Sequence, residues 1–185
     1  MTIETDKGTK TVRVYTTDGK VTSACVDMGY AALDTTALHL NIPKRQVVDY
    51  PVEIGGQSWN ITCVDMGNPH CVVFCPRVDG VDVGTVGPLF EHAPYFPDRI
   101  NTEFIRVVNP STIKMRVWER GSGETMACGT GACAAVVAAV AAGQCEKGRD
   151  ITVRVRGGDL VVNYTDEKVT LTGDARLVYT GEVEY

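Results

Sequence analysis

Hydrophobic and polar residues alternate with a period of two along most of the chain, which is the pattern of β-strands with one buried face. Residues 11–16 alternate in this way, Asp18 and Gly19 provide a tight turn, and residues 21–28 resume the pattern, so a β-hairpin is predicted there. Further strands are predicted at residues 47–54, 59–66, 70–75, 104–108, 113–119, 151–155, 160–164, 169–171 and 176–179. Because most connections between these segments are short, we expect mainly antiparallel pairing.

Two segments have the pattern of helices instead. Residues 82–92 are followed by Pro94 and Pro97, which mark the end of a helix. Residues 129–143 are rich in Ala and Val and carry no charge before Glu146, so this helix should be buried on all sides. We therefore expect an α+β fold in which a curved, mainly antiparallel sheet wraps around one buried central helix.

Composition and charge argue against several classes of protein. The 185 residues are 44% hydrophobic and 22% charged, as in ordinary globular domains. The net charge is −5 at pH 7 and there is no basic tract, so nucleic-acid binding is not expected. The longest apolar run, residues 132–142, is too short to span a bilayer, and the N-terminus lacks the apolar segment of a signal peptide, so no membrane association is expected.

The seven cysteines are odd in number, which without a secretion signal favours free thiols and a cytoplasmic location. Cys63, Cys71 and Cys75 lie in or beside predicted strands at spacings that match no zinc pattern, so they are interpreted as small core residues and no metal site is expected. No nucleotide-binding fingerprint is present, and no cofactor is expected.

The segment from Glu119 to Cys133, ERGSGETMACGTGAC, runs from a predicted strand through a glycine-rich loop into the buried helix. Cys128 stands just before that helix, where free N–H groups and the helix dipole favour anions. The sequence therefore predicts a lowered pKa for Cys128 and makes it the expected most reactive thiol. The N–H groups of Gly129 and Thr130 are expected to hold a carboxylate or an oxyanion.

A second group of polar residues lies in the segment MGNPHC at residues 66–71. Asn68 and His70 are two positions apart, so in an extended strand both side chains point to the same face. Glu119 and Arg120 could together bind a zwitterion, because Arg binds carboxylates and Glu binds ammonium groups. Each of these pairs also has a purely structural interpretation, as a turn residue beside a strand histidine or as an exposed ion pair.

These two motifs, in this order and with Asn101 between them, resemble diaminopimelate epimerase over the whole chain. The resemblance implies inversion of one α-carbon of LL-diaminopimelate to give the meso form, without a cofactor, in lysine and peptidoglycan synthesis. It implies two cysteines on opposite faces of the substrate, and Cys128 matches one of them, usually drawn as the proton acceptor. It further implies that Gly129 and Thr130 hold the α-carboxylate, that Asn68, Asn101, Glu119 and Arg120 contact the substrate, and that His70 and Glu119 tune the thiols.

The chain departs from the family pattern because only one of its cysteines begins a Cys-Gly-x-Gly motif. The resemblance then implies remnant strands of an N-terminal domain at residues 1–29, a C-terminal domain at 30–173, and a strand at 174–185 that returns to the N-terminal domain. The expected partners are the small-molecule substrate and the N-terminal half of the enzyme. Self-association through unpaired strands is also expected, as is inactivity of this chain alone.

Three other interpretations of the sequence remain. A relative of the same fold could act on another amino acid, because helix N-termini that bind a carboxylate do not specify a side chain. A non-catalytic binding or assembly module would explain the single motif. A cysteine hydrolase would require His70 within hydrogen-bonding distance of Cys128.

Overall fold

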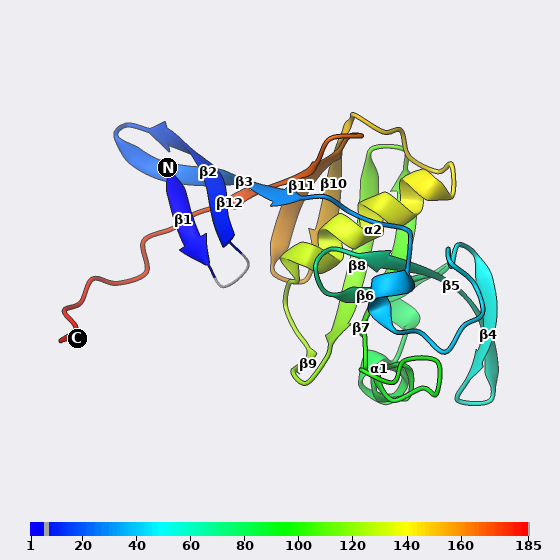
Figure 1. Cartoon of the computed structure of the whole chain (residues 1–185). Helices are drawn as coiled ribbons and strands as arrows, with labels where there is room; N and C mark the ends of the chain where they lie inside the picture. The colour runs from blue at the N-terminus through cyan, green and yellow to red at the C-terminus, as the bar shows by residue number, and fades with distance from the viewer. Residues whose placement is uncertain (6–7, 185) are drawn as a thin grey trace.

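A computed structural model describes residues 1–5 and 8–184 (Figure 1). The strands are β1 (Thr2–Thr5), β2 (Gly8–Thr17), β3 (Lys20–Gly29), β4 (Tyr50–Ile54), β5 (Gln57–Asp65), β6 (Pro69–Phe74), β7 (Asn101–Asn109), β8 (Thr112–Glu119), β9 (Gly123–Glu124), β10 (Asp150–Val155), β11 (Gly158–Tyr164) and β12 (Val169–Asp174). The helices are α1 (Val83–Glu91) and α2 (Gly129–Ala141), with short 3-10 turns at Thr36–Leu38 and Val78–Gly80.

The strands form one sheet in the order β1-β2-β3-β12-β11-β10-β8-β7-β6-β5-β4, and β9 adds to β8. Among the described strands, two neighbouring pairs are parallel, β6 with β7 and β8 with β10. A parallel pair needs a long crossover connection, and the two crossovers carry α1 and α2 respectively. The remaining pairs are antiparallel.

Helix α2 lies inside the curve of the sheet and contacts strands on both sides of it (Figure 1). All of its residues from Gly131 to Ala139 are buried, which explains why it carries only small apolar side chains. Alternation along β7 separates two cores: Ile105 packs towards α2, whereas Phe104 points to the opposite face. There Phe104 packs against Phe90 of α1, with ring centroids 5.5 Å apart.

The predicted α+β fold, with a mainly antiparallel sheet around one buried helix, is confirmed. Both predicted helices are present, and each predicted strand before residue 175 corresponds to an observed strand. The prediction of a strand at residues 176–179 is wrong for this chain, because none of the described strands pairs with that segment. Strands β1 and β9 and the 3-10 turns were not predicted, since each is too short to show a period.

The proposed division into segments 1–29, 30–173 and 174–185 stays a prediction. Strands β2 and β3 form a long hairpin that projects from the sheet, and β3 joins the main sheet through β12 (Figure 1). Residues 175–184 leave β12 without regular structure, and residue 185 lies outside the described residues. Along this tail, Leu177, Val178 and Tyr179 are each more than 80% exposed.

Candidate active site

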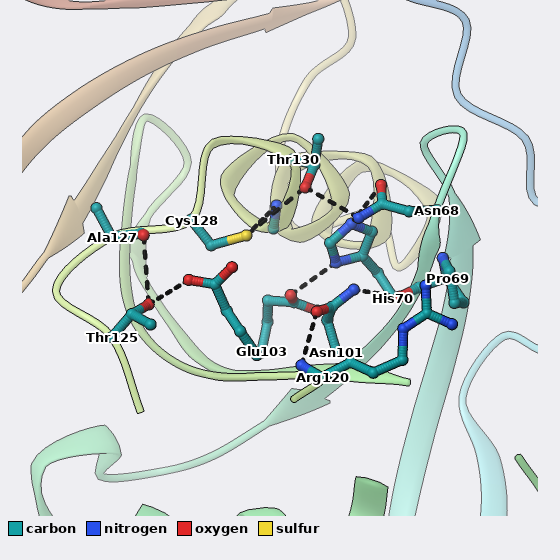
Figure 2. Close-up of polar contacts among 12 residues, drawn as sticks. Asn68, Pro69, His70, Asn101, Glu103, Arg120, Thr125, Ala127, Cys128 and Thr130 are labelled. Carbon is teal, nitrogen blue, oxygen red and sulfur yellow. Dashed lines mark hydrogen bonds and ion pairs between the residues drawn. The ribbon is translucent and has the colours of Figure 1, made fainter. Parts of the chain in front are cut away.

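The candidate site lies where α2 begins, beside the edge of the sheet at which β6 and β7 start and β8 ends (Figure 2). Cys128 is the N-cap residue of α2, with an extended backbone (φ −134°, ψ 115°). Its sulfur accepts a hydrogen bond from the N–H of Gly131 at 3.4 Å, the contact that an N-cap side chain usually makes. The first backbone bond of the helix runs from Ala132 to Cys128, so the helix itself does not use the N–H groups of Gly129 and Thr130.

The expectation of a lowered pKa at Cys128 is wrong. Burial raises the pKa of this thiol to about 11, and the negative charges of Glu103 and Glu119 add to the rise. Hydrogen bonds from Thr130 and Gly131 act in the opposite direction and are outweighed. At neutral pH Cys128 is therefore a thiol, the form that can donate a proton.

The predicted pair Asn68 and His70 does face the helix start. The Nδ2 atom of Asn68 donates to Oγ1 of Thr130 at 3.4 Å, and Oγ1 of Thr130 lies 3.6 Å from the sulfur of Cys128. The Oδ1 atom of Asn68 lies 3.1 Å from Nε2 of His70. Asn68 thus links the buried histidine to the first turn of α2 (Figure 2).

Glu103 belongs to the site although the sequence did not single it out. Its Oε1 lies 2.7 Å from Nδ1 of His70, and both side chains are fully buried. A Cβ atom at Gly131 would lie 2.6 Å from the same oxygen, so the carboxyl group fills the space that this glycine leaves. The signal in the sequence is a single acidic residue, two positions after Asn101, in the first half of a strand whose first five residues are buried.

Glu119 and Arg120 leave β8 in different directions. The side chain of Glu119 accepts a hydrogen bond from the hydroxyl of Thr125, a second residue that sequence reasoning missed. The charge of Glu119 acts on Cys128, as described above. The guanidinium of Arg120 is exposed and donates to the carbonyl of Asp98 at 2.8 Å. The two side chains therefore do not form an ion pair with each other.

Asn101 is buried, and both ends of its side-chain amide are engaged by the backbone. Its Nδ2 donates to the carbonyl of Pro69 at 2.8 Å, and its Oδ1 accepts from the N–H of Arg120 at 3.0 Å. The residue joins the start of β6 to the loop after β8. Its geometry shows a structural role, and a contact with substrate stays a prediction.

Two cavities open beside the site, and Asn68 lines both of them. One of about 280 Å³ is also lined by Asp65, Pro69, Asp98 and Arg120. The other, of about 500 Å³, lies between Thr130, Met66 and the hairpin residues Lys10 and Met28. Polar and apolar walls next to a helix N-terminus suit a small charged molecule.

Hydrogen bonds thus connect Cys128, Thr130, Asn68 and His70, all of which the sequence predicted. Asn101 and Arg120 lie beside this group, and Glu119 acts on it through its charge. The roles of all eight predicted residues in catalysis and binding stay predictions. Among residues 1–5 and 8–184, no cluster of side chains suits a metal ion, and no helix is long and apolar enough to cross a membrane.

Comparison with known proteins identifies close relatives. The sequence model of the family described as diaminopimelate epimerase matches residues 62–184. Diaminopimelate epimerase of Pelotomaculum thermopropionicum is 47% identical over 184 residues, which is 99% of this chain and 65% of the relative. The enzyme of the same name from Trichodesmium erythraeum is 49% identical over 168 residues, or 89% of this chain and 59% of the relative. The chain therefore spans less than two thirds of the length of these relatives.

Solved structures show the same fold at low sequence identity. A probable proline racemase from Agrobacterium radiobacter, 16% identical, superposes with a TM-score of 0.65 over 94% of this chain and 56% of its own. A hydroxyproline epimerase from Agrobacterium vitis, also 16% identical, gives a TM-score of 0.64 over 94% of this chain and 55% of its own. At this identity the likeness concerns the fold alone.

Proposed function

Because the chain belongs to the diaminopimelate epimerase family, we propose that it is the part of such an enzyme that carries Cys128, and that the whole enzyme interconverts LL- and meso-diaminopimelate. Lysine and peptidoglycan synthesis in the cytoplasm is the proposed setting. The observation that carries the proposal is the placing of a buried thiol at the N-cap of α2, beside two N–H groups that the helix does not use.

The chemical problem is the weak acidity of an amino acid α-proton. In the proposed reaction the N–H groups of Gly129 and Thr130 hold the α-carboxylate, and the positive end of α2 stabilises the negative charge that develops as the proton leaves. Burial strengthens this stabilisation, because water that would screen it is kept away. No cofactor takes part in the proposal.

Inversion needs an acid and a base on opposite faces of the α-carbon. A thiolate from outside this chain removes the α-proton on one face, leaving a carbanion. Cys128 then donates its S–H proton to the other face, which forms the new C–H bond and leaves Cys128 as a thiolate. The raised pKa of Cys128 supports this starting state, and the donors at Thr130 and Gly131 support the thiolate product. In the reverse reaction Cys128 is the acceptor, the role that the family resemblance usually gives it.

We assign the far end of the substrate, with its own ammonium and carboxylate, to the 280 Å³ cavity. Arg120 and Asn68 line this cavity, and Asp65 and Asp98 supply carboxylates on its walls. Arg binds a carboxylate through two parallel hydrogen bonds, and acidic side chains favour an ammonium group. Glu119 and Asn101 complete the proposed binding residues, with His70 and Glu119 tuning the thiols.

The proposed partner is the N-terminal part of the same enzyme, which would supply the second thiol. The exposed Leu177, Val178 and Tyr179 support this proposal, because such apolar surfaces are usually covered by other protein. The outer edge of β1 supports it too, because β1 pairs with β2 alone among the described strands. In its absence the same surfaces favour self-association of the chain.

The alternatives differ in what the geometry offers them. A cysteine hydrolase is not supported, because the ring nitrogens of His70 face Glu103 and Asn68 rather than the sulfur. An epimerase for another amino acid stays a second candidate, because the structures named as proline racemase and hydroxyproline epimerase share this fold.

The test is deuterium incorporation at the α-carbon in heavy water. The chain is assayed with LL-diaminopimelate and with proline, alone and mixed with the separately expressed N-terminal third of the Pelotomaculum relative. We expect exchange and inversion of diaminopimelate only in the mixture. Cys128→Ala should abolish the reaction, and Cys145→Ala, beyond the far end of α2, should keep it. Exchange of proline without exchange of diaminopimelate would overturn the proposed substrate.

A further inference from the structure

The buried pair of His70 and Glu103 has no part in the proton transfers described so far. Both side chains are fully buried and 2.7 Å separates Nδ1 from Oε1, a length typical of a charge-assisted hydrogen bond. The second oxygen of the carboxyl group, Oε2, has no hydrogen-bond partner among the described residues. A buried acidic group with an unused oxygen is costly, so the position needs an explanation.

The direction of each hydrogen bond can be assigned from its partners. Asn68 donates from Nδ2 to Thr130, which leaves its Oδ1, an atom that only accepts, facing Nε2 of His70. On the other side of the ring, Nδ1 faces a carboxylate oxygen. Both ring nitrogens therefore face oxygens that can accept a hydrogen bond, which is the arrangement that suits an imidazolium.

The same reasoning applies to Thr130. Its hydroxyl oxygen accepts from Asn68, and its single proton is then free for the sulfur of Cys128, 3.6 Å away. Figure 2 shows the row of contacts from His70 through Asn68 and Thr130 to the sulfur, and on this assignment each contact donates in the direction of the sulfur. The N–H of Gly131 adds a second donor to the same atom at 3.4 Å.

The carboxylate of Glu103 is suited to balance the imidazolium. It lies against Gly131 in the first turn of α2, where the helix dipole favours a negative charge. The charged groups that act on the sulfur are Glu103 from β7 and Glu119 from β8. The pair of His70 and Glu103 carries no net charge, which lowers the penalty of burying it.

We infer that Glu103 is a positioning residue for the Cys128 thiol: it holds His70 as an imidazolium, whose Nε2–H begins a one-way row of donors through Asn68 and Thr130 that ends on the sulfur. The row prepares the sulfur to carry the negative charge that proton donation leaves on it. The role of this row of hydrogen bonds in catalysis rests on the proposed function. The presence of the row itself does not depend on that function.

The first test uses the chain labelled with ¹⁵N-histidine. The chain has three histidines, and His39 and His92 are exposed and serve as references. At pH 7 we expect both ring nitrogens of His70 to show the chemical shifts of protonated nitrogens. In Glu103→Gln, which keeps the shape and cannot carry the charge, one ring nitrogen of His70 should lose its proton. An unprotonated nitrogen on His70 in the unchanged chain would overturn the inference.

The second test follows the sulfur end of the row. The rate of iodoacetamide alkylation at Cys128 is measured by peptide mass spectrometry at pH 8 to 10 in Thr130→Val and in Thr130→Ser. Loss of one donor to a charged sulfur should slow the reaction roughly five- to tenfold in the valine variant, and the serine variant should react like the unchanged chain. Equal rates in all three proteins would contradict the row. Neither test requires turnover, so failure of the epimerase assay and failure of this inference are distinguishable.

Discussion

The side-chain oxygen of Asn101 accepts a hydrogen bond from the backbone N–H of Arg120 at 3.0 Å, although the two residues are 19 positions apart. Asn101 is the first residue of β7, and Arg120 follows the last residue of β8. The other end of the same amide donates to Pro69 at the start of β6. One buried side chain therefore joins the start of β6, the start of β7 and the end of β8, three segments that carry polar residues of the site.

Replacing Asn101 by alanine should leave the N–H of Arg120 and the carbonyl of Pro69 without partners. We expect the free energy of unfolding to fall by about 1–3 kcal/mol, because two part-buried backbone groups lose their hydrogen bonds. Urea unfolding measures the change. The exposed Asn60, which bonds to Asp49 at 2.9 Å, provides the control, and Asn60→Ala should change stability by less than about 0.5 kcal/mol. Equal small effects at the two positions would show that Asn101 does not hold the segments.

Gly131→Ala should disturb the site directly. The added Cβ would lie 2.6 Å from Oε1 of Glu103 and 3.2 Å from the sulfur of Cys128, both closer than normal contact. We expect a loss of about 1–3 kcal/mol in unfolding free energy, as for overpacked cores. The matched variant is Gly84→Ala in α1, where the nearest atom would be 3.7 Å away, and it should be neutral or stabilising. A neutral Gly131→Ala would mean that Glu103 can move away without loss.

Glu91 should make the stability of the fold depend on pH in the acid range. Burial raises its pKa, but hydrogen bonds from the indole of Trp118 at 2.6 Å and the N–H of Gly121 at 3.0 Å outweigh burial and lower it. Because the pKa of Glu91 is lower in the folded state, its ionised form stabilises the fold at pH values above the ordinary pKa of 4.5. This contribution is lost as the pH falls through the lower pKa of the folded state. Glu91→Gln should therefore be less stable at pH 7 and lose less stability between pH 5 and 3. Parallel acid profiles for the two proteins would contradict this.

Cys133 should make the fold sensitive to alkali. Burial, with a further contribution from Cys128, raises the pKa of its thiol from 9.0 to about 12. The folded state then keeps a proton that the unfolded chain loses, so stability is complete below pH 9 and falls as the pH rises towards 12. The loss should reach about 2 kcal/mol by pH 10.5. Cys133→Ala should make the profile less steep between pH 9 and 10.5, where the buried thiols of Cys75 and Cys128 also contribute. Cys25→Ala, at a partly exposed position, should leave the profile unchanged.

Much of the fold could be predicted because its signals are local. The apolar run of α2 requires burial on all sides, and the hairpin at Asp18 and Gly19 combines a period of two with a turn dipeptide. The segment at 176–179 has the same period, yet it forms no strand here because a strand exists only with a neighbour. The periodicity of a segment shows its tendency to form a strand, but it does not identify the strand with which the segment pairs.

Some features of the site could likewise be predicted from local spacing, and others could not. The position of Cys128 before α2 and the shared face of Asn68 and His70 follow from spacing. The pKa of Cys128 could not be predicted correctly, because it depends on how deeply the sulfur is buried and on carboxylates that arrive from β7 and β8. Glu103 was missed for the same reason, since its partner His70 is 33 positions away and on another strand.

The pairing of β3 with β12 has a consequence for how the chain folds during synthesis. Lys168, just before β12, bonds to Asp27 of β3 across 141 positions of sequence. At ribosomal rates of about 5–20 residues per second, β3 leaves the ribosome on the order of ten seconds before β12 exists. Throughout that time one edge of the hairpin β2–β3 is open. Closing the sheet is therefore a late, long-range step of folding, and the open edge of β3 is exposed to wrong partners until β12 is made.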